Sequence, residues 1–81
     1  MKVEKGKYKH FKNKFYEVIE VARDCEDSSN EFVVYRALWD SDDFGYGQIW
    51  IRSVEDFCGD KIFENGQKVK RFEFVGDEDE S

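Results

Sequence analysis

The fold is decided by residues Phe32–Trp39, which read FVVYRALW. Aromatic and β-branched side chains fill most of this segment, and such residues favour a packed, pleated strand. We therefore expect the strongest strand of the chain here. Because apolar residues occupy both parities, the sequence leaves open which face of residues 33–38 is buried.

Shorter strand-like runs lie on both sides of this segment, with turn and loop signals between them. Asn13-Lys14 predicts a tight turn, and Glu26–Asn30 and Asp40–Gly47 predict two polar loops. The predicted strands are Tyr8–Lys12, Phe15–Arg23, Gln48–Arg52 and the two runs inside Lys61–Val75. In Gln48–Arg52 the alternation predicts that Ile49 and Ile51 point inward, while Trp50 and Arg52 share the opposite face.

The β pattern is interrupted once and then resumes. Ser53, with Asp56 three residues later, resembles a capping box, which predicts one short helical or 3-10 turn near residues 53–58. Asn65-Gly66 then separates two strand-like runs, and this dipeptide favours a type I′ hairpin turn. Phe72 and Phe74 share a parity in the last run, and we expect both in the core.

These features predict a mostly β protein with a small antiparallel curled sheet or an SH3-like barrel of five to six strands. A flatter sheet packed as half of a dimer is the alternative. We expect a single small β domain over residues 1–76 and an acidic disordered tail over residues 77–81. Eight Phe, four Tyr and two Trp supply the large side chains that such a small core needs.

The net charge of −6 at pH 7 argues against a nucleic-acid partner, which usually requires a basic surface. A local strip of six Lys against one Glu in residues 1–14 keeps that partner from being excluded, although edge-strand lysines also prevent sheet aggregation. No signal peptide or membrane-length apolar run is expected. We therefore expect a cytoplasmic protein with Cys25 and Cys58 reduced.

Five segments resemble, in order, the bacterial family called domain of unknown function sixteen-fifty-three. They are GKYKHFK (Gly6–Lys12), FYEVIEVARDCE (Phe15–Glu26), VVYRAL (Val33–Leu38), WIRSVEDF (Trp50–Phe57) and RFEFV (Arg71–Val75). The resemblance covers nearly the whole chain and implies a small cytoplasmic bacterial domain, with no activity attached.

Three positions depart from the family pattern. Ser53 replaces a proline, Asp56 replaces a methionine, and Asp24 stands where a second histidine is common. The absent histidine weakens any metal or acid–base role built on a histidine pair. His10 is then the only histidine of the chain, and we expect no catalytic residue, metal site or cofactor.

The arginines suggest a different kind of site, because Arg23, Arg36 and Arg52 each follow an apolar run. An arginine among aromatic side chains can stack on a ring and present its planar fork to a carboxylate or phosphate. The candidate ligand-binding residues are Tyr8, His10, Tyr35, Arg36, Trp50 and Arg52. The alternative is that the arginines pair with strand carboxylates such as Glu17, Glu20 or Glu73.

Three functions follow from these residues. The first is a binding or adaptor module whose aromatic–arginine face takes a peptide or a small anionic ligand. The second is a protein that self-associates through strand edges and aromatic loops. The oligomeric state stays open between a monomer and a homodimer. The third and weakest is a small enzyme that uses His10, and whether the protein is an enzyme stays open.

Overall fold

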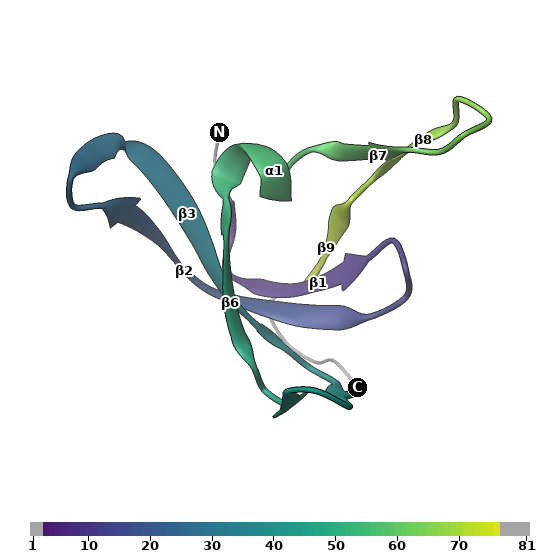
Figure 1. Cartoon of the computed structure of the whole chain (residues 1–81), viewed down its shortest axis with the longest axis horizontal. Coiled ribbons are helices and arrows are strands. Elements are labelled where there is room, and N and C mark those ends of the chain that lie inside the picture. The colour runs from purple at the N-terminus through teal and green to yellow at the C-terminus, as the bar shows by residue number, and fades with distance from the viewer. Residues whose placement is uncertain (1–2, 77–81) are drawn as a thin grey trace.

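The computed structural model describes residues 3–76, which are built around one curled antiparallel sheet (Figure 1). Five strands are hydrogen-bonded in the order β6-β3-β2-β1-β9, and β4–β5 and β7–β8 form two small hairpins. The elements are β1 (Gly6–His10), β2 (Phe15–Asp24), β3 (Asp27–Ala37), β4 (Asp40–Ser41), β5 (Gly45–Tyr46), β6 (Ile49–Ser53), α1 (Val54–Phe57), β7 (Asp60–Ile62), β8 (Lys68–Lys70) and β9 (Phe72–Gly76).

The mostly β, antiparallel prediction is confirmed, but the sheet is open over the described residues. Strands β6 and β9 lie at its two edges and do not pair with each other, so no closed barrel forms within residues 3–76. Curvature comes instead from the long β2–β3 hairpin, whose register shifts near Ile19. An extra residue in one strand bends it and increases its twist. The predicted tail at residues 77–81 lies outside the described residues.

The predicted polar loop Glu26–Asn30 is wrong, because most of it belongs to a strand. Asp24 pairs with Asp27, so only Cys25 and Glu26 form the turn, and Asp27–Asn30 extend β3. These residues are exposed, and only Asp27 has a paired partner, because the register shifts between Arg23 and Asp24. Ser28–Asn30 form a bulge in which the Ser28 carbonyl accepts a hydrogen bond from Arg23 Nη1 at 3.0 Å and the Ser29 N–H donates to the Asp27 carboxylate at 3.1 Å. An ion pair between Arg23 and Glu31, with 3.2 Å between nitrogen and oxygen, lies across the same ladder.

The buried face of β3 carries Val33, Tyr35 and Ala37, which settles the question that the sequence left open. On β6, Arg52 lies opposite Val33 and Trp50 lies opposite Tyr35. Directly paired residues share a face of a sheet. Trp50 and Arg52 therefore lie on this inner face.

The prediction that Ile49 and Ile51 point inward is consequently wrong. Both isoleucines lie on the outer face, opposite Arg36 and Val34 respectively, and both are exposed. The strand alternates as expected, but it is an edge strand whose outer face nothing covers among residues 3–76. Hydrophobicity alone therefore identifies the wrong face.

The helical turn is confirmed at Val54–Phe57, capped by Ser53. The Ser53 hydroxyl oxygen accepts a hydrogen bond from the Asp56 N–H at 3.2 Å. This cap turns the chain over the inner face, where Phe57 stacks on Phe72 with 4.1 Å between ring centroids. The buried core consists of Tyr8, Val18, Val33, Tyr35, Val54, Phe57 and Phe72.

Phe74, which we expected in the core, is 42% exposed and only borders it. It shares the inner face with Phe72 and contacts Tyr8 at 5.2 Å between ring centroids. Because β9 is an edge strand, part of the Phe74 ring stays open to solvent. Its parity is as predicted, but its burial is not.

The hairpin around Asn65-Gly66 forms, but its turn is not of type I′. Only Gly66 has a positive φ, at 89°, and its N–H bonds to the Phe63 carbonyl at 2.9 Å. This three-residue loop matches a type I turn followed by a left-handed residue. The β1–β2 turn repeats the arrangement, with Asn13 at φ 68° in the position of Gly66.

Replacing Phe57 by alanine should destabilise the domain by about 3–5 kcal/mol, because the ring is only 2% exposed and anchors the helical turn. Phe44, which is 56% exposed, is the matched control, and Phe44→Ala should change the free energy of unfolding by less than about 1 kcal/mol. Urea unfolding followed by circular dichroism measures both. Equal losses of unfolding free energy in the two variants would show that the Phe57–Phe72 stack does not stabilise the core.

Candidate ligand pocket on the inner face

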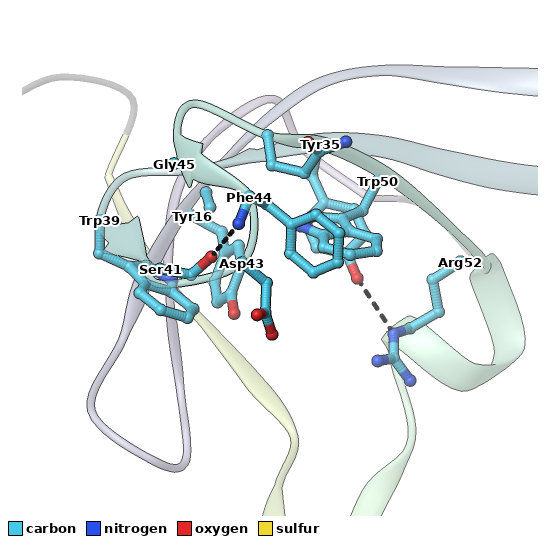
Figure 2. A pocket seen from close by; sticks show the side chains of 11 residues that line it. Tyr16, Tyr35, Trp39, Ser41, Asp43, Phe44, Gly45, Trp50 and Arg52 are labelled. Atoms are coloured by element: carbon cyan, nitrogen blue, oxygen red, sulfur yellow. Dashed lines mark hydrogen bonds between the residues drawn. The ribbon is translucent and has the colours of Figure 1, made fainter.

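A pocket of about 350 Å³ opens on the inner face where α1 does not cover it. Its walls are aromatic and its polar groups are few (Figure 2). We call it the aromatic–arginine pocket and define it by Tyr16, Tyr35, Trp39, Asp43, Phe44, Trp50 and Arg52, with Ala37, Ser41, Gly45 and Gln48 completing the lining.

Three neighbouring strands and one loop position these side chains. Tyr16 on β2, Tyr35 on β3 and Trp50 on β6 all project from the inner face of the sheet. The rings of Tyr16 and Tyr35 meet edge to face at 5.4 Å between centroids. The strand register therefore sets the floor of the pocket.

The loop Asp40–Gly47 forms the side wall and is ordered by its own hydrogen bonds. The Phe44 N–H donates to the Ser41 hydroxyl at 2.9 Å, and β4 pairs with β5 across the loop. This turn brings the Phe44 ring edge to face against Trp50, with 5.1 Å between centroids. The sequence predicted this loop, but not the pairing within it.

Arg52 is the cationic group of the pocket and is held in place by its surroundings. Its Nε donates to the Tyr35 hydroxyl at 3.3 Å, as Figure 2 shows, and the guanidinium carbon lies 5.7 Å from the centre of the Phe72 ring. Within residues 3–76 no carboxylate lies in ion-pair range of Arg52. Its terminal nitrogens are therefore available to an anion.

The other two arginines within strands, Arg23 and Arg36, behave differently. Arg36 Nε lies 3.2 Å from a carboxylate oxygen of Glu17, and Arg23 pairs with Glu31 at the same distance. Both pairs form between strands, as the alternative interpretation of the arginines predicted. Arg52 is thus the strand arginine that joins aromatic rings without a carboxylate in the described chain.

The structure brings three of the six candidate residues together in this pocket: Tyr35, Trp50 and Arg52. Arg36 lies on the outer face, since adjacent residues of a strand point to opposite sides. The Tyr8 ring is buried in the core, and its hydroxyl donates to the Glu4 carbonyl at 2.8 Å. Burial, the largest cause, raises the pKa of Tyr8.

His10 lies on the inner face but lines a different cavity, beside Phe11 and Phe63. Its Nδ1 accepts a hydrogen bond from the Lys12 N–H at 3.2 Å, which fixes it within the β1–β2 turn. Burial lowers the pKa of His10, and the positive charges of Arg52, Lys12 and Arg71 lower it further. No carboxylate or thiol hydrogen bond to the imidazole occurs in the described chain.

Sequence reasoning missed four residues of the pocket: Tyr16, Trp39, Asp43 and Phe44. Tyr16 had a usable signal, because it shares a parity with Val18 on a strongly apolar strand. Trp39 follows the end of β3, and its ring lies 4.5 Å from the Lys14 ammonium, while its buried indole N–H has no partner among the described residues. The contact between Lys14 and Trp39 depends on tertiary packing, and no pattern in the neighbouring sequence predicts it.

Other kinds of site receive no support in residues 3–76. No group of three or more His, Cys, Asp or Glu side chains there is arranged to hold a metal ion. Cys25 is exposed and Cys58 is half-buried, and both are free thiols. No helix among these residues has the length and apolar character needed to cross a bilayer.

A curled antiparallel sheet with one capped helical turn and a single-sided aromatic core defines a small β domain. The family model described as "Protein of unknown function (DUF1653)" matches residues 6–74. The chain therefore belongs to this bacterial family, the one that its sequence motifs resemble.

The fold is similar to that of a solved structure from the same family, described as the crystal structure of a protein belonging to DUF1653 from Bordetella bronchiseptica. The TM-score is 0.77 at 23% sequence identity, over 98% of this chain and 95% of that chain. At this identity the likeness concerns the fold alone. No curated protein matches the chain.

Removing the positive charge of Arg52 should raise the pKa of His10, because that charge disfavours the protonated imidazole. In Arg52→Gln the pKa stays below its ordinary value, since burial is the larger cause. Arg36→Gln, on the outer face, is the control and should leave it unchanged. A pH titration of the imidazole Cε1–H NMR signal measures all three proteins.

The same shift makes stability depend on pH. A lowered pKa means that the folded state binds fewer protons than the unfolded state, so stability falls as pH drops from the ordinary histidine range through the folded pKa. A His10 pKa at the ordinary histidine value, or one that does not change in Arg52→Gln, would contradict the placement of these two groups.

Proposed function

We propose that this domain is a binding module whose aromatic–arginine pocket takes a small ligand made of a planar ring joined to an anionic group. The observation that supports the proposal is the set of contacts around Arg52. Its guanidinium is oriented by the Tyr35 hydroxyl, lies near aromatic rings, and has no carboxylate in ion-pair range within the described chain. A fixed arginine fork of this kind suits a carboxylate or a phosphate.

The walls of the pocket support the ring part of the ligand. Its volume of about 350 Å³ falls in the range of small-molecule sites, which are mainly apolar with a few fixed polar groups. Trp50, Tyr35 and Tyr16 offer aromatic surfaces against which a planar ring can stack. Trp50 and Phe44 remain exposed at the rim, so a ligand would remove apolar surface from water.

Asp43 adds a second polar requirement. Its side chain lines the same pocket but lies beyond ion-pair range of Arg52. A ligand that brings its anion to Arg52 therefore gains from carrying an amino or other donor group at its far end, toward Asp43. An isolated anion without a ring or donor uses only part of the site.

This chemistry has two sources, a free metabolite-like molecule and the end of a peptide whose last residue is aromatic. Small β folds host many unrelated functions, so the fold supports neither source by itself. His10 has no acid–base partner in the described chain and lies outside the pocket, and we therefore propose binding rather than catalysis.

The test is a two-dimensional NMR titration that follows the Trp50 indole N–H and the Arg52 Nε–H. The probes are mononucleotides, aromatic amino acids, aromatic carboxylates without an amino group, and short peptides ending in an aromatic residue. We expect saturable shifts centred on the pocket, weakened by added salt because an ion pair is screened. Bound anion should also raise the pKa of His10 by offsetting the charge of Arg52.

Two variants locate the interaction. Arg52→Gln should weaken binding about 10- to 100-fold, the usual effect of losing a charged hydrogen-bond partner. Arg36→Gln, a surface arginine paired with Glu17 on the other face, should leave the affinity unchanged. No saturable shift with any probe, or equal losses in the two variants, would refute the proposal.

A further inference from the structure

Strand β6 is an open edge of the sheet with little of the usual protection. It pairs with β3 alone, over five consecutive residues without a bulge. On its other side the carbonyl of the first residue, Ile49, accepts a hydrogen bond from the Gln48 side-chain amide at 3.0 Å. Three consecutive exposed side chains, Ile49, Trp50 and Ile51, are large and apolar. Natural sheets protect such edges with lysine, proline, a bulge or an inward-pointing charge, and of these β6 has only the inward-pointing Arg52.

The opposite edge is different. The ladder between β9 and β1 shifts its register between Lys7 and Tyr8, and β9 carries the charged Glu73. Both edge strands therefore carry one charged residue, Glu73 on β9 and Arg52 on β6, but only the β9 ladder is interrupted. An unprotected apolar edge is a template for another strand.

We infer that β6 pairs antiparallel with β6 of a second copy of this chain, about a twofold axis at Ile51. Ile51 is the middle residue of the five-residue strand, so this register uses every residue of β6. The five-stranded sheets of the two copies then form one continuous sheet. This inference does not rest on the ligand proposed for the aromatic–arginine pocket.

The side chains of β6 complement themselves in this register. The only charged residue of the strand is Arg52, two positions from Trp50 on the same face. A twofold axis at Ile51 sets each Arg52 opposite the partner's Trp50, where a guanidinium interacts favourably with an indole ring. An axis at Arg52 itself would set two like charges opposite each other, which destabilises a strand pair.

The outer face is complementary as well. Ile51 meets the partner's Ile51, and Ile49 meets the partner's Ser53. Val34, paired with Ile51 inside one copy, extends this apolar strip onto β3. Cross-strand apolar contacts of this kind are the unit of sheet stabilisation.

Net charge sets the salt dependence of the assembly. Each copy carries −6 at pH 7, so the two copies repel each other over distances that salt screens. Dimerisation should therefore strengthen as salt is added, whereas binding of an anion at Arg52 weakens. The two proposals thus respond in opposite directions to the same change of buffer.

Sedimentation of the full chain tests the assembly. Ile51→Lys adds a charge at the axis and should shift the monomer–dimer equilibrium at least about tenfold toward monomer. Ile62→Lys is a closely matched control, because Ile62 on β7 is 61% exposed and Ile51 is 63% exposed. The control should dimerise like the unchanged chain, and thermal unfolding verifies that both variants are folded.

Disulfide formation tests the register. In a Cys25→Ser background, Ile51→Cys should form a covalent dimer at least about tenfold faster than Ile62→Cys, because directly opposite side chains are within reach of a disulfide. Ile49→Cys should not exceed the control by itself, whereas Ile49→Cys combined with Ser53→Cys should crosslink rapidly.

A chain that sediments as a monomer up to about 1 mM at high salt would overturn the inference. Equal crosslinking of Ile51→Cys and Ile62→Cys would overturn it too. Because Ile51 does not line the aromatic–arginine pocket, ligand titrations on Ile51→Lys still report on the pocket alone. A failure of one proposal therefore leaves the other to be judged separately.

Discussion

The stack of Phe57 on Phe72 is the contact on which the rest of this structure depends. It joins the helical turn α1 to β9, the last strand described, and both rings contact Tyr35 on β3. A domain of this size buries little surface, so a few large rings must supply most of the apolar contact. Because α1 is only one turn long, it covers part of the inner face and leaves the remainder open as the aromatic–arginine pocket.

Tyr35 connects that core to the pocket. Its ring is buried against Phe57 and Phe72, while its hydroxyl accepts the hydrogen bond from Arg52. A side chain that is fixed by packing holds its hydrogen-bond partner more precisely than a mobile one. The rigid core therefore determines the direction of the arginine fork, and the loop Asp40–Gly47 is left to shape the opposite wall.

Sequence reasoning succeeded where a local signal coincided with the final packing. The strand over Phe32–Ala37, the capped turn at Ser53 and the hairpin at Asn65-Gly66 were all predicted, because each depends on a few neighbouring residues, although Leu38 and Trp39 lie beyond the end of the strand. It failed where the position of a residue in the tertiary structure decides its burial or its secondary structure. Ile49 and Ile51 are apolar but lie on an uncovered face, and Asp27–Asn30 are polar but belong to strand β3. Arg36 was grouped with Tyr35, although adjacent strand residues point to opposite faces.

The pairing of β1 with β9 joins two segments from opposite ends of the described chain. Tyr8 and Phe72, which belong to one buried cluster, are therefore brought together by the longest loop closure in the fold. On the ribosome, β1, β2 and β3 can pair early, but the core gains Phe72 only after β9 has been synthesised. Folding of this small domain is thus tied to the completion of its last strand, and a chain cut short before β9 keeps an unfinished core.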